Sequence, residues 1–508
     1  MNRRWLLLTG LFLWILETGI IVNASIPWLL GRVNADDFFY YLVLARNAAA
    51  GLGPTFDGLD ITNGFHPLYL GMLIPLAKIP IQDTAFLIKA GLVILLFFHN
   101  ATGLVIGYKT WQISRGAYGW LAALMWLLNP WALIITLYGV EVPIAVFLWA
   151  VIIYLLQTAR QRDVPLDLGR AFMLGLLLGL TILARTDGLM LLGAILVTEF
   201  FRALKRPKQR TDIVISLIIV SIVVFLTTLP WWWWNLQHFG TISQVSGKAV
   251  FLGAHGFNWY QPDFIATKTL AASFAYFARA ITYGLLPLLV LGFTFWKRKY
   301  ADKPSPAFGF RSLWGELDFA FLAIVLLALW YAGWQWHIQN WYLLSTVLVA
   351  TIIVAIIVVK LDQLQTRLDI QQVAGVVFLV SLVSMLGIFS RGDTGFPRQA
   401  NGYYLARWLN QHTEADAVIG AWNSGIIGYF TDRTVVNLDG VVNNSIYEYR
   451  IQHRAEGVGQ LMPYIRDRQI TYLTDYEYIY FAEPETMGMG EVYESPEHEF
   501  RVYQLIRR

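Results

Sequence analysis

Four carboxylates lie beside or between long apolar stretches of the sequence. Asp36 and Asp37 are adjacent, Glu141 separates two apolar runs, and Asp187 comes two residues after Arg185. Ionisable groups at membrane depth are costly, so each is a functional candidate by default. A carboxylate can take a proton from a hydroxyl or bind hydroxyl groups through hydrogen bonds. These positions are therefore candidates for a general base and for a sugar-binding site.

Each candidate also has a structural explanation that the sequence leaves open. Asp36 or Asp37 can cap the helix that follows, because a carboxylate at a helix start accepts hydrogen bonds from unpaired N–H groups. Arg185 and Asp187 can form an ion pair within a tight turn between two apolar runs. Glu141 can be an interfacial acid that contacts water.

The composition places these residues in a membrane protein. The chain has 508 residues, of which 56% are hydrophobic and 14% are charged. Soluble chains carry about 25% charged residues, and the mean hydropathy of this chain is +0.51. These values exclude a disordered chain, a coiled coil and an ordinary soluble enzyme. The absence of cysteine excludes disulfides, thiolate metal sites and a cysteine nucleophile.

Long apolar runs predict a mainly α, polytopic transmembrane bundle of about eleven helices within residues 1–390. The expected spans are 5–26, 84–107, 117–137, 142–160, 169–184, 187–204, 211–230, 269–296, 317–337, 341–360 and 370–389. The first span follows Arg3 and Arg4 and is too long for a signal-peptide core. We therefore expect it to remain in the protein as a signal anchor.

One short apolar segment, residues 66–80, decides the topology. At about 15 residues it is short for a membrane-spanning helix. If it does not cross, 19 of the 27 Lys and Arg residues before position 391 share one side with the N-terminus. Cytoplasmic loops carry an excess of Lys and Arg, so we expect this segment to be re-entrant or interfacial within a first outer loop, 27–83. The interpretation is a multi-pass plasma membrane protein with a cytoplasmic N-terminus.

Residues 391–508 differ in composition from the bundle. They hold 11 Arg, no Lys and 16 Asp or Glu, a net charge of −5, whereas the first 390 residues hold 27 basic and 18 acidic residues, a net charge of +9. The basic excess therefore indicates membrane topology rather than nucleic-acid binding. Short apolar runs predict a C-terminal extracytoplasmic α/β domain. Strands are expected at 417–422, 434–438, 470–473 and 500–506, and helices at 401–412, 425–430 and 457–466.

The predicted topology gathers the candidate residues on one side of the membrane. It was derived from the basic residues of the connections, yet it puts the four carboxylates on the outer face. Other basic side chains fall on or near that face, namely Arg46, His66, Lys248, His255, Lys268 and His337. Cations suit a phosphate, and carboxylates suit a hydroxyl. An outer pocket that joins a lipid phosphate to an acceptor hydroxyl needs both kinds of group.

An ordered series of motifs resembles the GT-C superfamily of polytopic glycosyltransferases, particularly its arabinofuranosyltransferase and mannosyltransferase-like branches. The series is Asn34-Ala-Asp-Asp-Phe-Phe-Tyr-Tyr-Leu-Val-Leu-Ala-Arg-Asn47, Gly51-Leu-Gly53, Thr62-Asn-Gly-Phe-His-Pro-Leu-Tyr69, Gly139-Val-Glu141 and Ala184-Arg-Thr-Asp-Gly188. Asn235-Leu-Gln-His-Phe-Gly240, followed by Lys248, resembles a later loop of those enzymes. Val436-Asn-Leu-Asp-Gly-Val-Val-Asn443 resembles a motif of their C-terminal domain.

The resemblance implies a polyprenyl-phosphate-dependent hexosyl- or pentosyltransferase. The acceptor would be a hydroxyl of a glycan, lipid or protein outside the cytoplasm, and transfer would usually invert the anomeric carbon. An acid of the first outer loop would be the catalytic base. We prefer Asp36 to Asp37 here, because residues resembling Asp36 open the family's first-loop motif. The expected substrate-binding residues are Glu141, Arg185, Asp187, Lys248, Arg46, His66, His337 and Asp439.

The sequence is compatible with a divalent metal cofactor and with one alternative function. Asp36, Asp37 and Glu141 are candidate ligands for Mg²⁺ or Mn²⁺, which favour carboxylate and water, but the sequence requires no cofactor. The expected partners are the lipid-linked donor, the acceptor and membrane lipid, with no nucleic acid. The alternative function is a transporter or flippase for a polyprenyl-linked glycan. Transporters often show internal repeats, which this sequence lacks.

Overall fold

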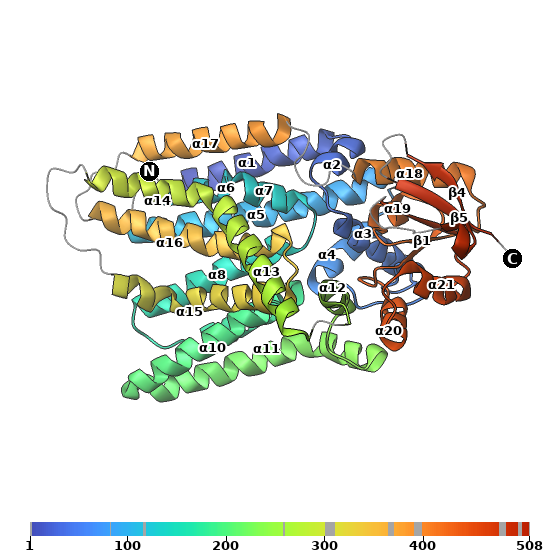
Figure 1. Ribbon diagram of the computed structural model, residues 1–508. Coiled ribbons are helices and arrows are strands. Elements are labelled where there is room, and N and C mark those ends of the chain that lie inside the picture. The colour runs from blue at the N-terminus through green and yellow to red at the C-terminus, as the bar shows by residue number, and fades with distance from the viewer. Residues whose placement is uncertain are drawn as a thin grey trace.

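A bundle of long helices carries a small α/β domain at one end, and the N-terminus lies at the opposite end (Figure 1). The computed structural model describes residues 3–506 except for 82, 115–117, 258–259, 300–309, 364–369, 391–398, 477–483 and 496–499. The predicted domain boundary after residue 390 meets one of these ranges, so the linker itself lies outside the described residues.

A helix occupies each predicted span. The helices are α1 (Arg3–Asn23), α5 (Thr84–Ser114), α6 (Tyr118–Leu127) with α7 (Pro130–Leu137), α8 (Val142–Gln161), α9 (Leu168–Ala184), α10 (Gly188–Lys205), α11 (Arg210–Phe239), α13 (Pro262–Tyr283) with α14 (Leu285–Lys299), α15 (Phe310–Ala328), α16 (Leu344–Gln363) and α17 (Ile370–Ser390). By length and composition, six helices in the described part of the chain can each cross a membrane, and the two bent pairs can add one span each. This is fewer than the eleven spans predicted, in part because α9 has only 17 residues. The protein is a multi-pass membrane protein.

The bend of 47° between α6 and α7 has a local cause. The Asn129 side chain accepts hydrogen bonds from the N–H groups of Trp131 and Ala132, and Pro130 takes the first position of α7. Asparagine is a preferred N-cap, and proline suits the first turn because its missing N–H would be unpaired there. This stretch therefore starts a new helix instead of continuing α6.

Short helices form a layer between the bundle and the α/β domain. They are α2 (Ile26–Arg32), α3 (Asp36–Ala49), α4 (Pro67–Ala77) and α12 (Val245–His255). The helix α4 is the short apolar segment that decided the topology. Its 11 residues extend about 17 Å at 1.5 Å per residue, whereas the hydrocarbon core is about 30 Å thick. A helix of this length cannot cross, as the sequence predicted.

The C-terminal α/β domain contains a five-stranded sheet in the order β2-β1-β3-β5-β4. Its elements are α18 (Gln399–His412), β1 (Val418–Ala421), α19 (Gly425–Phe430), β2 (Thr434–Asn437), α20 (Asn444–His453), α21 (Val458–Asp467), β3 (Tyr472–Tyr476), β4 (Met489–Glu494) and β5 (Phe500–Leu505). Strands β2, β1 and β3 are parallel, and β5 runs antiparallel to β3 and β4. The four predicted strands and three predicted helices are present. The additional α20 and β4 are too polar to give an apolar pattern.

The α/β domain and the bundle share a hydrophobic core. One cluster of buried side chains joins Ile88 of α5, Phe39 of α3 and Ile419 of β1. The two parts also approach closely at Gly64, where an added Cβ would lie 1.9 Å from the carbonyl oxygen of Val441. Only glycine fits there, so this contact fixes how the α/β domain sits on the segment between α1 and α5.

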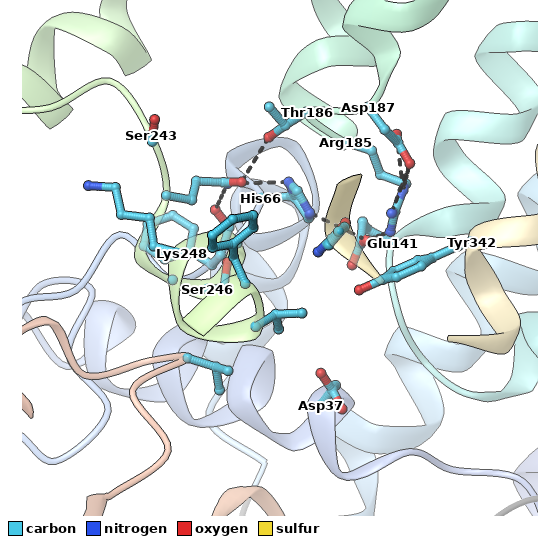
Figure 2. Close-up of a pocket in the computed structure, with 18 of the residues that line it drawn as sticks. Asp37, His66, Glu141, Arg185, Thr186, Asp187, Ser243, Ser246, Lys248 and Tyr342 are labelled. Atoms are coloured by element: carbon cyan, nitrogen blue, oxygen red, sulfur yellow. Dashed lines mark hydrogen bonds and ion pairs between the residues drawn. The ribbon is translucent and has the colours of Figure 1, made fainter. Parts of the chain in front are cut away.

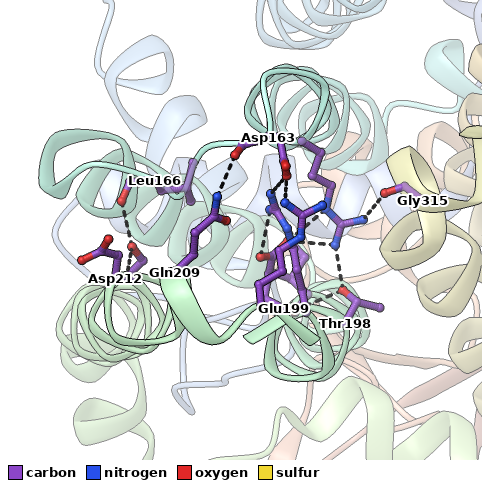
Figure 3. Close-up of polar contacts among 12 residues, drawn as sticks. Asp163, Leu166, Thr198, Glu199, Gln209, Asp212 and Gly315 are labelled. Atoms are coloured by element: carbon purple, nitrogen blue, oxygen red, sulfur yellow. Dashed lines mark hydrogen bonds and ion pairs between the residues drawn. The ribbon is translucent and has the colours of Figure 1, made fainter. Parts of the chain in front are cut away.

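A buried ion-pair network holds the other end of the bundle (Figure 3). The Arg160 guanidinium of α8 donates a hydrogen bond of 2.9 Å to Glu199 of α10 and forms an ion pair with Asp318 of α15. Thr198 accepts a further hydrogen bond of 3.2 Å from Arg160. Because removing one partner of a buried ion pair is costly, this network ties three helices together far from the α/β domain.

Candidate functional site

A cavity of about 660 Å³ lies where the bundle, the layer of short helices and the α/β domain meet. Its walls come from α3, the start of α8, the α9–α10 turn, α12 and a π-helical turn at Leu329–Gln335. Val441 and Tyr447 add a wall from the α/β domain. Six predicted site residues line this cavity, namely Asp37, His66, Glu141, Arg185, Asp187 and Lys248 (Figure 2).

Asp37 faces the cavity with a free carboxylate. In the described part of the chain no other residue donates a hydrogen bond to it, and Figure 2 shows it across open space from Glu141 and Tyr342. Its side chain is open to the cavity, but the cavity itself is enclosed by protein on several sides, which keeps the carboxylate away from bulk water. Burial, together with the negative charges of Asp36 and Glu141, raises the pKa of Asp37 to about 7. A carboxyl group of this pKa can accept a proton near neutral pH.

Asp36 points the other way, into the α/β domain. Its two carboxylate oxygens accept hydrogen bonds from the N–H groups of Gly425, at 2.9 Å, and Ile426, at 2.8 Å. These N–H groups belong to the start of α19, where helix donors lack partners within the helix. Asp36 thus caps a helix of another domain. Of the two aspartates, Asp37 lines the cavity and Asp36, the residue that the motif series preferred as the base, does not.

The helical repeat of α3 explains why these neighbours diverge. Asp37, Tyr40, Tyr41 and Leu44 all line the cavity, and positions i, i+3, i+4 and i+7 share one face of a helix. Asp36 lies about 100° around the helix axis from Asp37. The face that carries Asp37 therefore forms the cavity floor, and the face that carries Asp36 packs on α19.

Glu141, Arg185 and Asp187 form one buried cluster in the cavity wall. Arg185 Nη1 lies 2.5 Å from Glu141 Oε1, and Arg185 Nη2 lies 2.9 Å from Asp187 Oδ2. The Tyr41 hydroxyl donates to Glu141 Oε2 at 2.8 Å, and the Tyr331 hydroxyl donates to Asp187 Oδ2 at 2.5 Å. The Arg185–Asp187 ion pair that the sequence offered as a structural explanation is therefore present, and both residues also line the cavity.

Lys248 lines the cavity on the side opposite this cluster (Figure 2). Burial lowers the pKa of its ammonium group, and the nearby charge of Glu448 acts in the opposite direction. Within the described ranges no acid forms an ion pair with Lys248. An ammonium group in this situation is available to an anionic ligand.

Besides Asp36, three predicted residues lie outside the cavity lining. Arg46 donates hydrogen bonds of 3.2 Å to the carbonyl groups of Gly428 and Tyr429 and so holds the last turn of α19. Asp439 accepts a hydrogen bond of 2.7 Å from the Val441 N–H, which fits its explanation as a turn residue. His337 is 2.8 Å from the side chain of Gln339. None of these three is among the cavity residues.

The three candidate metal ligands do not come together as a site. Among the described residues no group of three His, Asp or Glu side chains is arranged to hold an ion. The oxygens of Asp36 accept backbone hydrogen bonds, and those of Glu141 are bound to Arg185 and Tyr41. Asp37 is left as a single carboxylate, so this donor set does not fit Mg²⁺ or Mn²⁺ held by all three.

Much of the remaining cavity wall is apolar. Its lining includes Leu189, Met190, Trp232, Phe251, Trp330 and Trp334. Trp330 is 40% and Trp334 is 46% exposed, so this wall continues to the surface of the bundle. A polar cluster beside an open apolar wall suits an amphiphilic ligand with a charged head and a hydrocarbon chain.

Sequence reasoning missed several residues of the site. Tyr41, Thr186, Gln244, Tyr331 and Tyr342 all line the cavity. Tyr41 follows Asp37 by four positions, a signal that helical periodicity could have supplied. Gln244 and Tyr342 lie in segments whose mutual contacts are set by tertiary packing, and no local pattern marks them.

Solved structures of other proteins share this arrangement of a multi-pass helical bundle with a C-terminal domain. In structure, the chain resembles ArnT from Cupriavidus metallidurans bound to undecaprenyl phosphate, with a TM-score of 0.59 and 11% identity over 99% of this chain and 98% of that chain. It also resembles the apo oligosaccharyltransferase of Archaeoglobus fulgidus, with a TM-score of 0.54 and 13% identity over 97% of this chain and 74% of that one.

A third similar structure is the oligosaccharyltransferase AglB of the same archaeon in complex with an inhibitory peptide and a dolichol-phosphate. Its TM-score is 0.51, at 14% identity over 97% of this chain and 74% of that chain. At the level of sequence, residues 396–507 match the family described as "Domain of unknown function (DUF8728)". No curated protein matches the chain by sequence. These likenesses confirm the predicted GT-C fold.

Proposed function

We propose that this protein is a membrane glycosyltransferase that takes a sugar from a polyprenyl-phosphate donor and transfers it to an acceptor hydroxyl. The observation that carries the proposal is the free Asp37 carboxylate, whose pKa is raised to about 7, facing a cavity with a polar cluster and an apolar wall. Two proteins of the same fold have structures that contain undecaprenyl phosphate and dolichol-phosphate, respectively, and this supports a lipid-linked donor.

In the proposed reaction, Asp37 removes the proton from the acceptor hydroxyl as its oxygen attacks the anomeric carbon. The bond from that carbon to the phosphate oxygen breaks, and polyprenyl phosphate leaves with the electron pair. Lys248 and the His66 N–H would stabilise the departing phosphate, because both groups line the cavity. Attack from the side opposite the phosphate inverts the anomeric carbon.

The lipid-linked donor would occupy both the polar and the apolar part of the cavity. The tryptophan-rich wall would hold the prenyl chain, and the Glu141–Arg185–Asp187 cluster would bind sugar hydroxyls and hold the positive charge of Arg185 near the phosphate. The topology that the basic residues favour would place this cavity, with the α/β domain, on the extracytoplasmic side. The donor sugar would be a hexose or a pentose, and the acceptor a glycan, lipid or protein.

The test uses the purified full-length protein with a panel of polyprenyl-phosphate hexoses and pentoses and candidate acceptors. We expect sugar transfer that consumes the donor and releases polyprenyl phosphate. The same protein in sealed vesicles is assayed for movement of a lipid-linked glycan between leaflets. Movement without transfer would replace this proposal by the transporter function, and neither activity would indicate a subunit that keeps the fold without the chemistry.

A further inference from the structure

His66 makes contacts through both ring nitrogens in the cavity wall (Figure 2). Its Nδ1 lies 3.2 Å from Gln244 Nε2, and its Nε2 lies 3.6 Å from Glu141 Oε1. His66 directly precedes α4, and Gln244 directly precedes α12. Two helix starts from distant parts of the chain are therefore joined through this ring.

The orientation of the Gln244 amide is fixed by its other partners. Its Nε2 contacts the carbonyl oxygen of Phe65, and its Oε1 accepts a hydrogen bond of 2.8 Å from the Thr186 hydroxyl. A backbone carbonyl only accepts hydrogen bonds, so the amide atom beside it must be the NH₂ group. If the amide were turned around, Gln244 Oε1 would face the carbonyl oxygen of Phe65. Both atoms only accept hydrogen bonds, so a buried hydrogen bond would be lost.

The state of His66 follows from this orientation. The Gln244 NH₂ group donates, so His66 Nδ1 must accept and cannot carry a hydrogen. A neutral imidazole then carries its hydrogen on Nε2. The protonated imidazolium is also excluded at this contact, because its Nδ1–H would face the N–H of Gln244.

The groups around His66 act in opposite directions on its protonation state. Burial has the largest effect on His66 and disfavours the imidazolium, as does the positive charge of Arg185. The negative charges of Glu141 and Asp187 favour it. Because burial dominates, the pKa of His66 lies below its usual value. At 3.6 Å the Nε2 to Glu141 separation is long for a hydrogen bond. The N–H is therefore available to a ligand in the cavity, to which it adds no positive charge.

We propose that Gln244 is a positioning residue that holds His66 as the neutral Nε2–H tautomer and directs this N–H into the cavity as a hydrogen-bond donor to the substrate, with Thr186 holding Gln244 in place. The three residues come from the loop before α4, the α9–α10 turn and the start of α12. The α9–α10 turn also carries Arg185, so the same contact sets the His66 donor beside the ion-pair cluster. The effect on turnover rests on the proposed function, whereas the tautomer does not.

The test is nitrogen NMR of the full-length protein with ¹⁵N-labelled histidine, in which a bare ring nitrogen and one that carries hydrogen resonate far apart. The signals of His66 are assigned by their loss in His66→Asn. We expect the wild type to show a bare Nδ1 and a protonated Nε2. Glutamate at position 244 can only accept, so Gln244→Glu should move the hydrogen to Nδ1 and raise the pKa of His66.

Matched variants separate this from a general disturbance of the site. Gln261→Glu makes the same change at an exposed residue before α13 and should leave the His66 signals as in the wild type. Gln244→Met removes both N–H donors of the amide in a side chain of similar size, and it should give a mixture of His66 tautomers. This variant replaces Gln244→Glu in the test if Gln244→Glu does not fold. Thr186→Val should give a smaller shift toward that mixture, and Thr186→Ser should not.

Activity is measured on the same samples. A misplaced donor commonly costs about 10²-fold in rate, so Gln244→Glu should lose turnover to that extent with an altered pH profile. An Nδ1–H tautomer in the wild type, or a His66 spectrum that Gln244→Glu and Gln244→Met leave unchanged, would overturn the inference. A wild type with the expected tautomer and no transferase activity would overturn the proposed function alone.

Discussion

The carboxylates of Asp36 and Asp37, adjacent in sequence, serve different domains. Asp36 caps α19 in the α/β domain through hydrogen bonds of 2.9 and 2.8 Å, whereas Asp37 faces the cavity. Arg46, at the end of the same helix α3, holds the last carbonyl groups of α19. The helix that carries the proposed base is therefore clamped at both ends to the α/β domain, and docking of that domain sets the position of Asp37.

The first prediction is that Asp36→Asn lowers stability. An amide keeps one acceptor oxygen but loses the negative charge that suits a helix start. Loss of a cap costs about 0.5–2 kcal/mol, so we expect a lower melting temperature and faster hydrogen exchange in α19. Asp416→Asn is the control, because Asp416 is exposed and should tolerate the change. An Asp36→Asn protein as stable as Asp416→Asn would contradict the capping role.

The second prediction concerns pH and follows from the raised pKa of Asp37, about 7 against its ordinary 3.8. The folded protein holds this proton more tightly than the unfolded chain, so the contribution of Asp37 to stability is present below about pH 4 and is lost as the pH rises through 7. Asp37→Asn should therefore be as stable as the wild type in acid and more stable at pH 8. Transfer by the wild type should rise through pH 7 as Asp37 ionises. Activity that is highest at pH 5 would contradict this prediction.

The third prediction is that Arg185→Lys weakens use of the donor while the protein still folds. Lysine keeps the charge but loses the planar fork that contacts Glu141 and Asp187 together. Hydrogen bonds to charged groups contribute about 1.5–3 kcal/mol, so kcat/KM for the donor should fall by roughly 10- to 100-fold, since each 1.4 kcal/mol is tenfold.

The matched control for Arg185 is Arg160→Lys, which makes the same change in the buried network at the far end of the bundle (Figure 3). It should lower the melting temperature and leave kcat/KM of the folded protein unchanged. If the two variants lost donor use equally, Arg185 would have only a structural role.

The fourth prediction is topological. The N-terminus and the α/β domain lie at opposite ends of the bundle (Figure 1), and the distribution of Lys and Arg favours a cytoplasmic N-terminus. A reporter fused after Arg508 should therefore behave as extracytoplasmic, and one fused before Met1 as cytoplasmic. The reverse pattern would move the cavity, and with it the proposed reaction, to the cytoplasmic side.

Much of the fold could be predicted because its signals are local. The apolar runs predicted the helices of the bundle, and the short length of residues 66–80 predicted a segment that does not cross. The strands at 434–438 and 500–506 carry apolar runs that are visible without any tertiary information. The polar helix α20 has no such run, so nothing in its sequence marked it.

The site was harder to predict because its contacts are not local. The sequence brought Asp37, Glu141 and Arg185 to one side of the membrane, and they share one cavity. It could not show that Arg46 binds α19, 382 and 383 residues further along the chain. Nor could it separate Asp36 from Asp37, because the difference depends on which face of α3 packs on the α/β domain.

The most direct test of the central claim is turnover by Asp37→Asn with a polyprenyl-phosphate sugar that the wild type accepts, beside Asp36→Asn measured under the same conditions. Loss of a general base commonly costs about 10²–10⁴ in rate. We predict a loss of that size for Asp37→Asn, with unchanged donor binding and an intact fold, and a milder loss for Asp36→Asn that follows its lower stability. Near-normal turnover by Asp37→Asn would contradict the account.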